Sequence, residues 1–385
     1  MEVYLDNSAT TRVAPEVIAL MTKIMSEDYG NAASLHQKGV DAEQYIRKAK
    51  EQIAATLKVE PKTIYFTSGG TESNNWAITG TALANRRRGM HLITTVIEHP
   101  SVKNTMRFLE EEMGFSVTYL PVDENGVLSV DTVRKAIRPD TILVSVMYVN
   151  NEIGALQPIE EIGEMLSKEF PDVYFHVDAI QAYGKFEIRP KRMHIDMLSC
   201  SGHKLHGPKG VGFLYVNDRV KLKPIIYGGG QQKGMRSGTE NVPGAAGLGL
   251  AAEMMYTDFS AKIEALRARK KQLLEGLQTL DGAHVNGLFG EDSAPQIVSC
   301  SFDGIRSEVL LHALEEKKIY VSSGSACSSS HPSEVNTLLA IGLTRERQEG
   351  TIRFSLNPEV SEADIEYTLG ALREILSVLR RFVRR

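Results

Sequence analysis

The hydrophobic positions in the first two thirds of the chain alternate between helical and strand-like spacing. Apolar and small residues recur at helical intervals over residues 42–57, and Thr63-Ile64-Tyr65-Phe66-Thr67 then has the pattern of a buried strand. Helical stretches at about 101–113 and 158–168 separate several further strand candidates. This alternation predicts a largely parallel sheet with helices on both faces. The further strand candidates are residues 91–96, 116–120, 141–149, 173–177, 195–199 and 211–216.

The pattern changes near residue 245. A long helical segment at roughly 246–278 leads into shorter alternating pieces. The last helix is expected to begin at Ser361, where Ser361-Glu362-Ala363-Asp364 resembles a capping box and an apolar stripe follows. We therefore predict an α/β fold. A large domain of residues 12–250 would hold a mostly parallel, mixed sheet flanked by helices, and a smaller α+β domain would comprise residues 1–11 and 251–385.

Composition and charge exclude several classes of protein. The 385 residues are 42% hydrophobic and 24% charged, as in a soluble globular protein with a large core. The formal net charge is -4, and no basic block is long enough to suggest nucleic-acid binding. No run approaches the ~18 apolar residues of a membrane span. Three cysteines cannot all pair and no signal-peptide pattern opens the chain, so we expect a cytoplasmic protein.

The segment Ser201–Gly210 places a lysine where its charge is hard to solvate. Lys204 stands between His203 and His206, on a loop that follows the predicted strand 195–199. A buried lysine has a lowered pKa and can act as a Schiff-base nucleophile. The alternative is an ordinary surface lysine in a tight turn.

A second loop has the composition of an anion-binding turn. Ser68-Gly69-Gly70-Thr71 lies between a predicted strand and a predicted helix, where glycines let the backbone approach an anion and helix N–H groups can bind it. The segment matches neither GxGxxG nor a P-loop, so a phosphate is favoured over a dinucleotide or a nucleoside triphosphate. A simple glycine turn is the alternative.

Polar residues follow other predicted strands at the edge where open α/β sheets bind ligands. Asp178 comes directly after residues 173–177, where its carboxylate could pair with a ring nitrogen or, alternatively, cap a following helix. Asn150-Asn151-Glu152-Ile153-Gly154 offers amide groups at the same edge. His99 lies on a strand-to-helix turn, where a structural role and a site role are both open.

Arg353 lies in an alternating strand pattern, opposite in orientation to Ile352 and Phe354. An inward-facing arginine can bind a carboxylate with two hydrogen bonds, whereas an exposed strand arginine would have no such role.

The three cysteines differ in context. Cys327 lies in a loop of small residues at about 322–335, which we expect to be mobile and exposed, so its thiol is a candidate nucleophile. Cys200 and Cys300 stand in apolar strand contexts and are predicted to be inert core residues. No Cys-x-x-Cys or histidine pairing accompanies them, so no metal site is predicted.

One cofactor would use these features together. A lysine that forms a Schiff base, a phosphate-binding turn, an aspartate for a pyridine nitrogen and an arginine for a carboxylate are what pyridoxal phosphate and an amino acid require. A plain aminotransferase does not need Cys327. The cysteine therefore implies a substrate with a group that a thiolate can attack.

With these motifs the chain closely resembles the cysteine desulfurases of the NifS/IscS type, which are class V aminotransferase-like, fold-type I pyridoxal phosphate enzymes. The resemblance runs nearly end to end and implies the fold of that group. The motifs that carry it are Tyr4–Thr11, Gly30–His36, Ser68–Asn75, Glu98-His99, Asn150–Gly154, His176–Gln181, Ser201–Gly210, Arg236–Asn241, Ser323–Ser328 and Arg353-Phe354-Ser355.

The resemblance implies roles for individual residues toward pyridoxal 5′-phosphate. Lys204 would bind the cofactor covalently and move protons, and His99 would stack on its ring and assist proton transfer. Asp178 would pair with the ring nitrogen and Gln181 would bond the ring oxygen. The phosphate would be held by Gly70, Thr71, Ser201 and His203, joined by Thr239 from the other subunit of a homodimer.

For the substrate, L-cysteine, the resemblance implies that Asn151, Arg353 and Asn7 are binding residues. Cys327 would attack the substrate sulfur, leaving a persulfide on the enzyme and releasing alanine. An acceptor such as an iron–sulfur scaffold protein would then take the sulfur. No resident metal is implied, although Cys327 has the chemistry to ligate an iron–sulfur cluster transiently.

The sequence departs from the family pattern in places. Asn31-Ala32-Ala33-Ser34 replaces the usual Asn-Pro-Ser-Ser. IscS-type chains commonly carry a C-terminal extension, whereas this sequence stops at Phe382-Val383-Arg384-Arg385, which favours a NifS-like member. His206 has no assigned role. Selenocysteine lyase activity, a plain aminotransferase or β-lyase, and a binding protein with an inactive fold remain alternatives.

Overall fold

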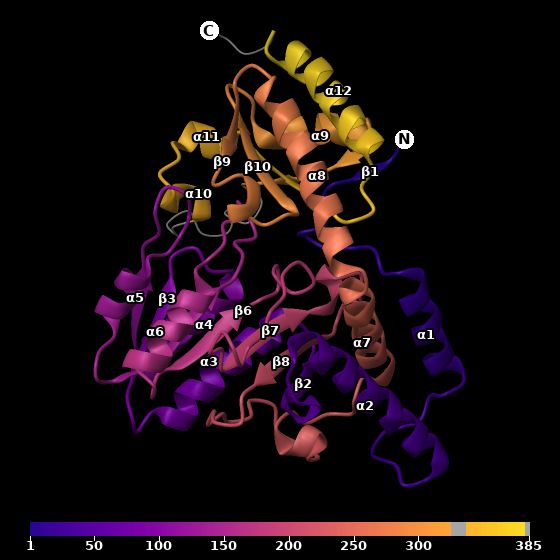
Figure 1. Ribbon diagram of the computed structural model, residues 1–385, viewed down its shortest axis with the longest axis vertical. Coiled ribbons are helices and arrows are strands. Elements are labelled where there is room, and N and C mark those ends of the chain that lie inside the picture. The colour runs from indigo at the N-terminus through magenta and orange to yellow at the C-terminus, as the bar shows by residue number, and fades with distance from the viewer. Residues whose placement is uncertain (325–335, 382–385) are drawn as a thin grey trace.

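A seven-stranded sheet dominates the first two thirds of the chain, and a four-stranded sheet lies above it in Figure 1. The computed structural model describes residues 1–324 and 336–381. The helices and strands of these residues are β1 (Val3–Tyr4), α1 (Pro15–Ser26), α2 (Gln37–Leu57), β2 (Ile64–Thr67), α3 (Gly70–Asn85), β3 (His91–Thr95), α4 (Pro100–Met113), β4 (Ser116–Leu120), α5 (Val130–Ala136), β5 (Thr141–Met147), α6 (Ile159–Glu169), β6 (Tyr174–Asp178), β7 (Met197–Ser201), β8 (Gly212–Val216), α7 (Val242–Tyr256), α8 (Phe259–Gln278), β9 (Ala283–Asn286), β10 (Ile297–Phe302), α9 (Ser307–Glu316), β11 (Ile319–Tyr320), β12 (Ser322–Ser323), α10 (Thr337–Ala340), α11 (Arg345–Glu349), β13 (Thr351–Ser355) and α12 (Glu362–Leu379).

The large sheet has the strand order β2-β8-β7-β6-β5-β3-β4. The run from β7 to β4 pairs in parallel, and β8 is antiparallel to both of its neighbours. Parallel neighbours need long crossover connections, which explains why strand and helix patterns alternate along the sequence. The predicted α/β class with a mostly parallel, mixed sheet is confirmed.

Helices cover both faces of this sheet. Along β6, Tyr174 packs in a cluster with residues of α3 and α4, whereas the next residue, Phe175, packs in a cluster with residues of α1, α2, α6 and α7. Successive strand side chains point to opposite faces, so two adjacent apolar residues require two covered faces. Accordingly, β5, β6 and β7 are buried along their whole length.

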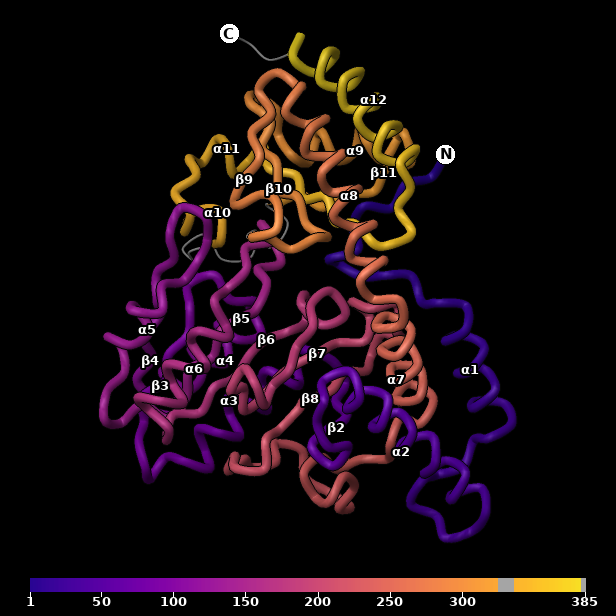
Figure 2. The backbone as a smooth tube through the Cα atoms, viewed as in Figure 1, coloured from indigo at the N-terminus to yellow at the C-terminus, as the bar shows by residue number. Residues whose placement is uncertain are grey.

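The last third of the chain builds a second hydrophobic core. Strands β12, β13, β10 and β9 form an antiparallel sheet, and apolar residues of α8, α9 and α12 pack in the same cluster. The N-terminal segment joins this core. Val3 of β1 pairs with Ile319 of β11, and Leu5 is fully buried in the cluster; Figure 2 shows the N-terminus beside this C-terminal part.

The long helical segment predicted at 246–278 is wrong as a single element. It consists of α7 and α8, which are separated by an extended residue, Thr257, and by Asp258 in the left-handed region at φ +49°. The two halves pack differently, because α7 contacts α1 and α2 whereas α8 contacts α12. The break lets the chain pass from the first core to the second, as Figure 1 shows.

The predicted capping box at the last helix is confirmed. Ser361 Oγ accepts from the backbone N–H of Asp364, and the Asp364 carboxylate accepts from the backbone N–H of Ser361. The sequence pattern did not reveal α1, which turns only Val17 and Ile24 fully inward. Among the described helices, none is long and apolar enough to cross a membrane.

Candidate active site

A cavity of about 330 Å³ lies where the carboxyl ends of the parallel strands meet the small sheet. Residues that follow β6 and β7 line one side, and residues of β12 and β13 line the other. Ligands bind at this edge in open α/β sheets. The predicted site residues that line the cavity are Gly70, Thr71, His99, Asn151, Asp178, Gln181, Ser201, His203, Lys204 and Arg353.

Lys204 enters the cavity from a single 3₁₀ turn, Gly202–Lys204, directly after β7. Its ammonium donates hydrogen bonds to the backbone carbonyls of Ser8 and Ala9, the second at 2.7 Å. Burial lowers the pKa of Lys204 to about 8, and the charge of Arg353 acts in the same direction. The amine therefore lies in the cavity rather than in a solvated surface turn, and it loses its proton more easily than a free lysine.

The turn between β2 and α3 has the geometry of an anion site. Gly69 has a φ of +145°, and a Cβ on Gly70 would lie 2.1 Å from Cδ1 of Ile180, so both positions favour glycine. Helix α3 begins at Gly70 without a side-chain cap, which leaves its first N–H groups available to an anion. Ser201 and His203 line the same cavity. This arrangement fits a phosphate group.

Asp178 is almost fully buried at the end of β6. Its Oδ1 accepts from the backbone N–H of Ile180 at 3.0 Å, and its Oδ2 accepts from Nδ2 of Asn74 at 2.8 Å. Burial raises the pKa of Asp178, and these donors together with the charge of Lys204 act against that rise. Residues 179–186 contain no helix, so the alternative role as a helix cap is not realised.

His99 is the N-cap residue of α4. Its Nδ1 accepts from the backbone N–H of Ser101 at 3.1 Å, and the hydroxyl of Ser101 lies 2.8 Å from the same nitrogen. Burial lowers the pKa of His99, which favours the neutral ring. Because Nδ1 is an acceptor, the neutral ring carries its proton on Nε2.

Arg353 lies on β13 and faces the cavity, while Ile352 and Phe354 point into the small core, so the predicted alternation is confirmed. Its guanidinium donates to the carbonyl of Asn151 at 2.9 Å and to Oδ1 of Asp6 at 3.0 Å. Within the described part of the chain, the buried Nε of Arg353 has no partner. A carboxylate bound in the cavity would supply an acceptor for this arginine.

The cavity therefore fits pyridoxal phosphate as the sequence motifs implied. An amine, an anion-binding helix start and a buried carboxylate lie in one enclosure. Gln181, which would meet the ring oxygen, is held in place by donating to the carbonyl of Ser8 at 3.0 Å.

Two of the implied residues, Asn7 and Thr239, do not line the cavity. Asn7 is buried, but its side chain donates to the carbonyl of Ser355 and accepts from Asn357, so it ties together two backbone segments. Thr239 is exposed and lies on another loop. Cys327 falls outside the described residues, so its implied role stays a prediction.

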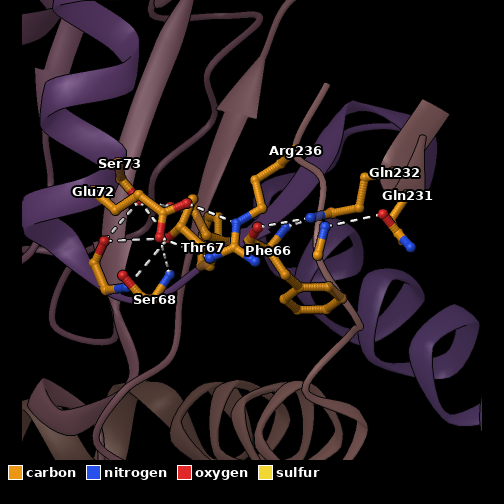
Figure 3. Close-up of polar contacts among 11 residues, drawn as sticks. Phe66, Thr67, Ser68, Glu72, Ser73, Gln231, Gln232 and Arg236 are labelled. Atoms are coloured by element: carbon orange, nitrogen blue, oxygen red, sulfur yellow. Dashed lines mark hydrogen bonds and ion pairs between the residues drawn. The ribbon is translucent and has the colours of Figure 1, made fainter. Parts of the chain in front are cut away.

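The loop that carries Thr239 is joined by hydrogen bonds to the turn Ser68–Thr71 between β2 and α3 and to strand β2. Figure 3 shows the carboxylate of Glu72 facing Arg236, which donates to it twice at 2.8 and 3.0 Å. The same carboxylate accepts from the backbone N–H of Ser68 at 2.8 Å. Gln232 reaches the edge strand β2, where its amide accepts from the N–H of Phe66 at 2.7 Å and donates to the carbonyl of Phe66 at 2.8 Å. Turn and loop are thus held as one unit.

Sequence reasoning missed two carboxylates near the cavity, the buried Glu98 and the half-buried Glu152. Glu98 accepts from the backbone N–H of Met147 at 2.9 Å, and burial raises the pKa of Glu98 to about 8. Glu152 lines the cavity, where burial raises its pKa and Thr337 donates to it at 3.1 Å. The sequence could have indicated both, because Glu98 precedes His99 and Glu152 lies inside the Asn150–Gly154 motif.

Cys200 and Cys300 are fully buried, and burial raises the pKa of both thiols, that of Cys300 to about 12. Their predicted place in the core is confirmed. In residues 1–324 and 336–381, no group of three or more metal-ligating side chains gathers. His206 holds the N-terminal segment in place. Its Nδ1 hydrogen-bonds the carbonyl of Arg12 at 3.0 Å, and its backbone N–H donates to the hydroxyl of Thr11.

Comparison with known proteins decides the family. The model of the class-V aminotransferases matches residues 3–368. The chain belongs to the class-V aminotransferase family. A relative from Methanosarcina thermophila, named cysteine desulfurase IscS, is 45% identical over 98% of this chain and 93% of its own length. A cysteine desulfurase IscS from Clostridium botulinum is 44% identical over 98% of this chain and 95% of its own length.

Similar solved structures agree with this assignment. A NifS-like protein superimposes with a TM-score of 0.93 at 39% identity, covering 98% of this chain and all of its own. A structure described as SspA in complex with cysteine gives a TM-score of 0.82 at 38% identity, covering 93% of this chain and 99% of its own. The resemblance to NifS/IscS-type proteins inferred from the motifs is confirmed.

Proposed function

We propose that this chain is a cysteine desulfurase that uses pyridoxal 5′-phosphate to convert L-cysteine into L-alanine and a persulfide on Cys327. The observation that carries the proposal is the shared cavity of the Lys204 amine, the uncapped start of α3, the Asp178 carboxylate and Arg353. The names of the relatives and the cysteine-bound neighbour support the same reaction and substrate.

Pyridoxal phosphate supplies an electron sink for negative charge at the substrate Cα. Lys204 would bind it covalently and carry the Cα proton, for which the lowered pKa of its amine is suited. Asp178 would hold a proton on the ring nitrogen, Gln181 would bond the ring oxygen, and His99 would stack on the ring. The phosphate would be held by Gly70, Thr71, Ser201 and His203.

The chain's own residues also set the course of sulfur transfer. Arg353, with Asn151 beside it, would hold the substrate carboxylate and so fix the position of the thiol. The Cys327 thiolate would attack the substrate sulfur. A sulfur–sulfur bond forms and the carbon–sulfur bond breaks, with its electron pair staying on carbon, which takes a proton to give alanine. No outside oxidant is needed.

The proposal includes partners. The active form would be a homodimer in which Thr239 of each subunit reaches the phosphate of the other. The exposed position of Thr239 outside its own cavity supports this arrangement. The persulfide would pass to an acceptor protein in the cytoplasm, such as an iron–sulfur scaffold.

The test combines a spectrum with a product assay. The purified chain mixed with pyridoxal phosphate should gain a visible absorbance band and release alanine and sulfide from L-cysteine under reducing conditions. Lys204→Ala should lose the band, and Cys327→Ala should keep the band but lose sulfide release. A colourless wild-type chain, or a Cys327→Ala variant with full sulfide output, would overturn the proposal.

A further inference from the structure

Asn74 of α3 connects two residues of the cavity that lie on different elements. Its side chain is fully buried. Its amide nitrogen donates to Oδ2 of Asp178 at 2.8 Å and to Oγ of Ser101 at 2.9 Å. Ser101 in turn contacts Nδ1 of His99 at 2.8 Å. A continuous chain of hydrogen bonds therefore runs from the end of β6 through α3 to the N-terminus of α4.

With Asp178 ionised, the direction of every bond in this chain is determined. A carboxylate accepts only, so the group of Asn74 that faces Asp178 is its NH₂ rather than its oxygen. The second proton of that NH₂ points to Ser101, whose hydroxyl oxygen must then accept. The hydroxyl proton is left for Nδ1 of His99, which also accepts from the Ser101 backbone N–H. The Asn74 amide therefore determines the hydrogen bonding at both Asp178 and His99.

The amide oxygen of Asn74, unlike its nitrogen, makes no hydrogen bond within the described residues. In the described structure Oδ1 of Asn74 is buried and has no hydrogen-bond partner. A buried acceptor without a partner is destabilising, and an apolar side chain of similar size would avoid that cost. The stability of α3 therefore does not explain an asparagine here, whereas the two donated bonds do.

We propose that Asn74 is a positioning residue that keeps Asp178 ionised and His99 in the neutral form with its proton on Nε2, so that the two cavity groups hold complementary proton states. The consequence for turnover rests on the proposed function, since Asp178 would then meet a protonated ring nitrogen while His99 presents Nε2 to the cavity.

The groups that face this pair remain the same when Asn74 is changed. His99 is faced by Asp178 from β6, Lys204 from its 3₁₀ turn and Lys103 from its own helix. Asp178 is faced by His99 and Lys204, and Glu98 lies close enough to interact with it. A change seen on removing the Asn74 amide therefore reports the lost hydrogen bonds rather than a lost charge.

The test uses Asn74→Leu, Ser101→Ala and a matched control, Asn85→Leu. Asn85 lies on the same helix, is also buried and also donates twice, to the carbonyls of Thr81 and Lys221, away from the cavity. The first readout is the titration of His99 by ¹⁵N NMR of the full chain, with its signals assigned through His99→Gln. The second is the dissociation constant of pyridoxal phosphate.

Asn74→Leu should raise the titration midpoint of His99 by about one on the pH scale, because the Ser101 hydroxyl, no longer bonded by the Asn74 amide, is then free to accept from a protonated Nδ1. It should also weaken cofactor binding about tenfold, because the Asp178 carboxylate loses a donor. Ser101→Ala should raise the midpoint of His99 and leave cofactor binding nearly unchanged. Asn85→Leu should change neither. If Asn74→Leu does not fold, Asn74→Ala takes its place.

The inference is overturned if the Asn74 variant matches Asn85→Leu in both measurements. Neither readout needs turnover, so the two proposals fail separately. A wild-type chain that binds the cofactor but releases no sulfide contradicts the proposed function and leaves the role of Asn74 to be judged by the titration of His99.

Discussion

The buried ammonium of Lys185 donates a hydrogen bond of 2.6 Å to the backbone carbonyl of Lys204. Two lysines thus lie close together in an interior where one positive charge is already costly. Burial lowers the pKa of Lys185 to about 8, and its charge also contributes to the low pKa of Lys204. Lys185 therefore holds the turn that presents Lys204 and favours the neutral, nucleophilic form of its amine.

Replacing Lys185 with Met should make Lys204 less reactive. Without the neighbouring charge, the pKa of Lys204 should rise by about 0.5, which lowers the neutral fraction of its amine near pH 8 about twofold. Competitive acetylation of the full chain without added cofactor, read by mass spectrometry, measures this directly. Lys191→Met, at an exposed position, is the control. Equal labelling of Lys204 in the two variants would contradict the prediction.

The Glu72–Arg236 pair should support cofactor binding from outside the cavity. Arg236→Lys cannot keep both hydrogen bonds in the same geometry, so the Ser68 turn should loosen. The chain should lose about 1.5–3 kcal/mol of stability, the usual contribution of a hydrogen bond to a charged group. Urea unfolding and the dissociation constant of pyridoxal phosphate should both change.

The control for this pair is Arg134→Lys, because Arg134 makes a comparable but exposed pair with Glu169. Exposed pairs contribute little to stability, so this variant should resemble the wild type in both measurements. Equal effects of Arg236→Lys and Arg134→Lys would show that the pair near the turn has no special role.

Arg353→Lys should weaken substrate binding more than it slows the chemical step. A lysine cannot donate from a planar group to Asp6, to the Asn151 carbonyl and to a substrate carboxylate at once. The KM for L-cysteine should rise at least about tenfold, in line with the loss of a charge-assisted bond. Steady-state kinetics measures this, with the exposed Arg345→Lys as control. A lower kcat at unchanged KM would argue against carboxylate binding.

Lys270 should make stability depend on pH. It is buried on α8, donates to Ser293 at 2.6 Å and to the carbonyl of Ala294 at 2.8 Å, and burial lowers its pKa to about 7. An unfolded lysine keeps its proton to a higher pH than this, so the unfolded state binds more protons between about pH 7 and 10. The free energy of unfolding should therefore rise with pH across that window.

Urea unfolding at pH 7 and pH 9 tests this effect of Lys270. The rise in stability should be smaller in Lys270→Met than in the wild type, and Lys271→Met, which changes an exposed neighbour, should keep the full rise. An identical pH dependence in Lys270→Met and the wild type would contradict the prediction.

Much of the fold could be predicted from local patterns in the sequence. The capping box at Ser361 and the apolar run before Asp178 depend on neighbours within a few residues, so they can be read without a structure. The site residues were recognisable because Asp178 and Lys204 follow strands whose carboxyl ends must meet at one edge. The break at Asp258 was not readable, because it depends on which core each half of the helical segment joins.

Local spacing alone was enough to predict the alternating α/β architecture, the glycine turn at Ser68–Thr71 and the residue types of the cavity. The side-chain pairings became visible only in the folded chain. They are Asp6 with Arg353, Lys185 with the Lys204 carbonyl, and Asn74 with Asp178 and Ser101. Such bonds join segments far apart in the chain. A local sequence pattern cannot predict these bonds, because their partners come close to one another only in the folded chain.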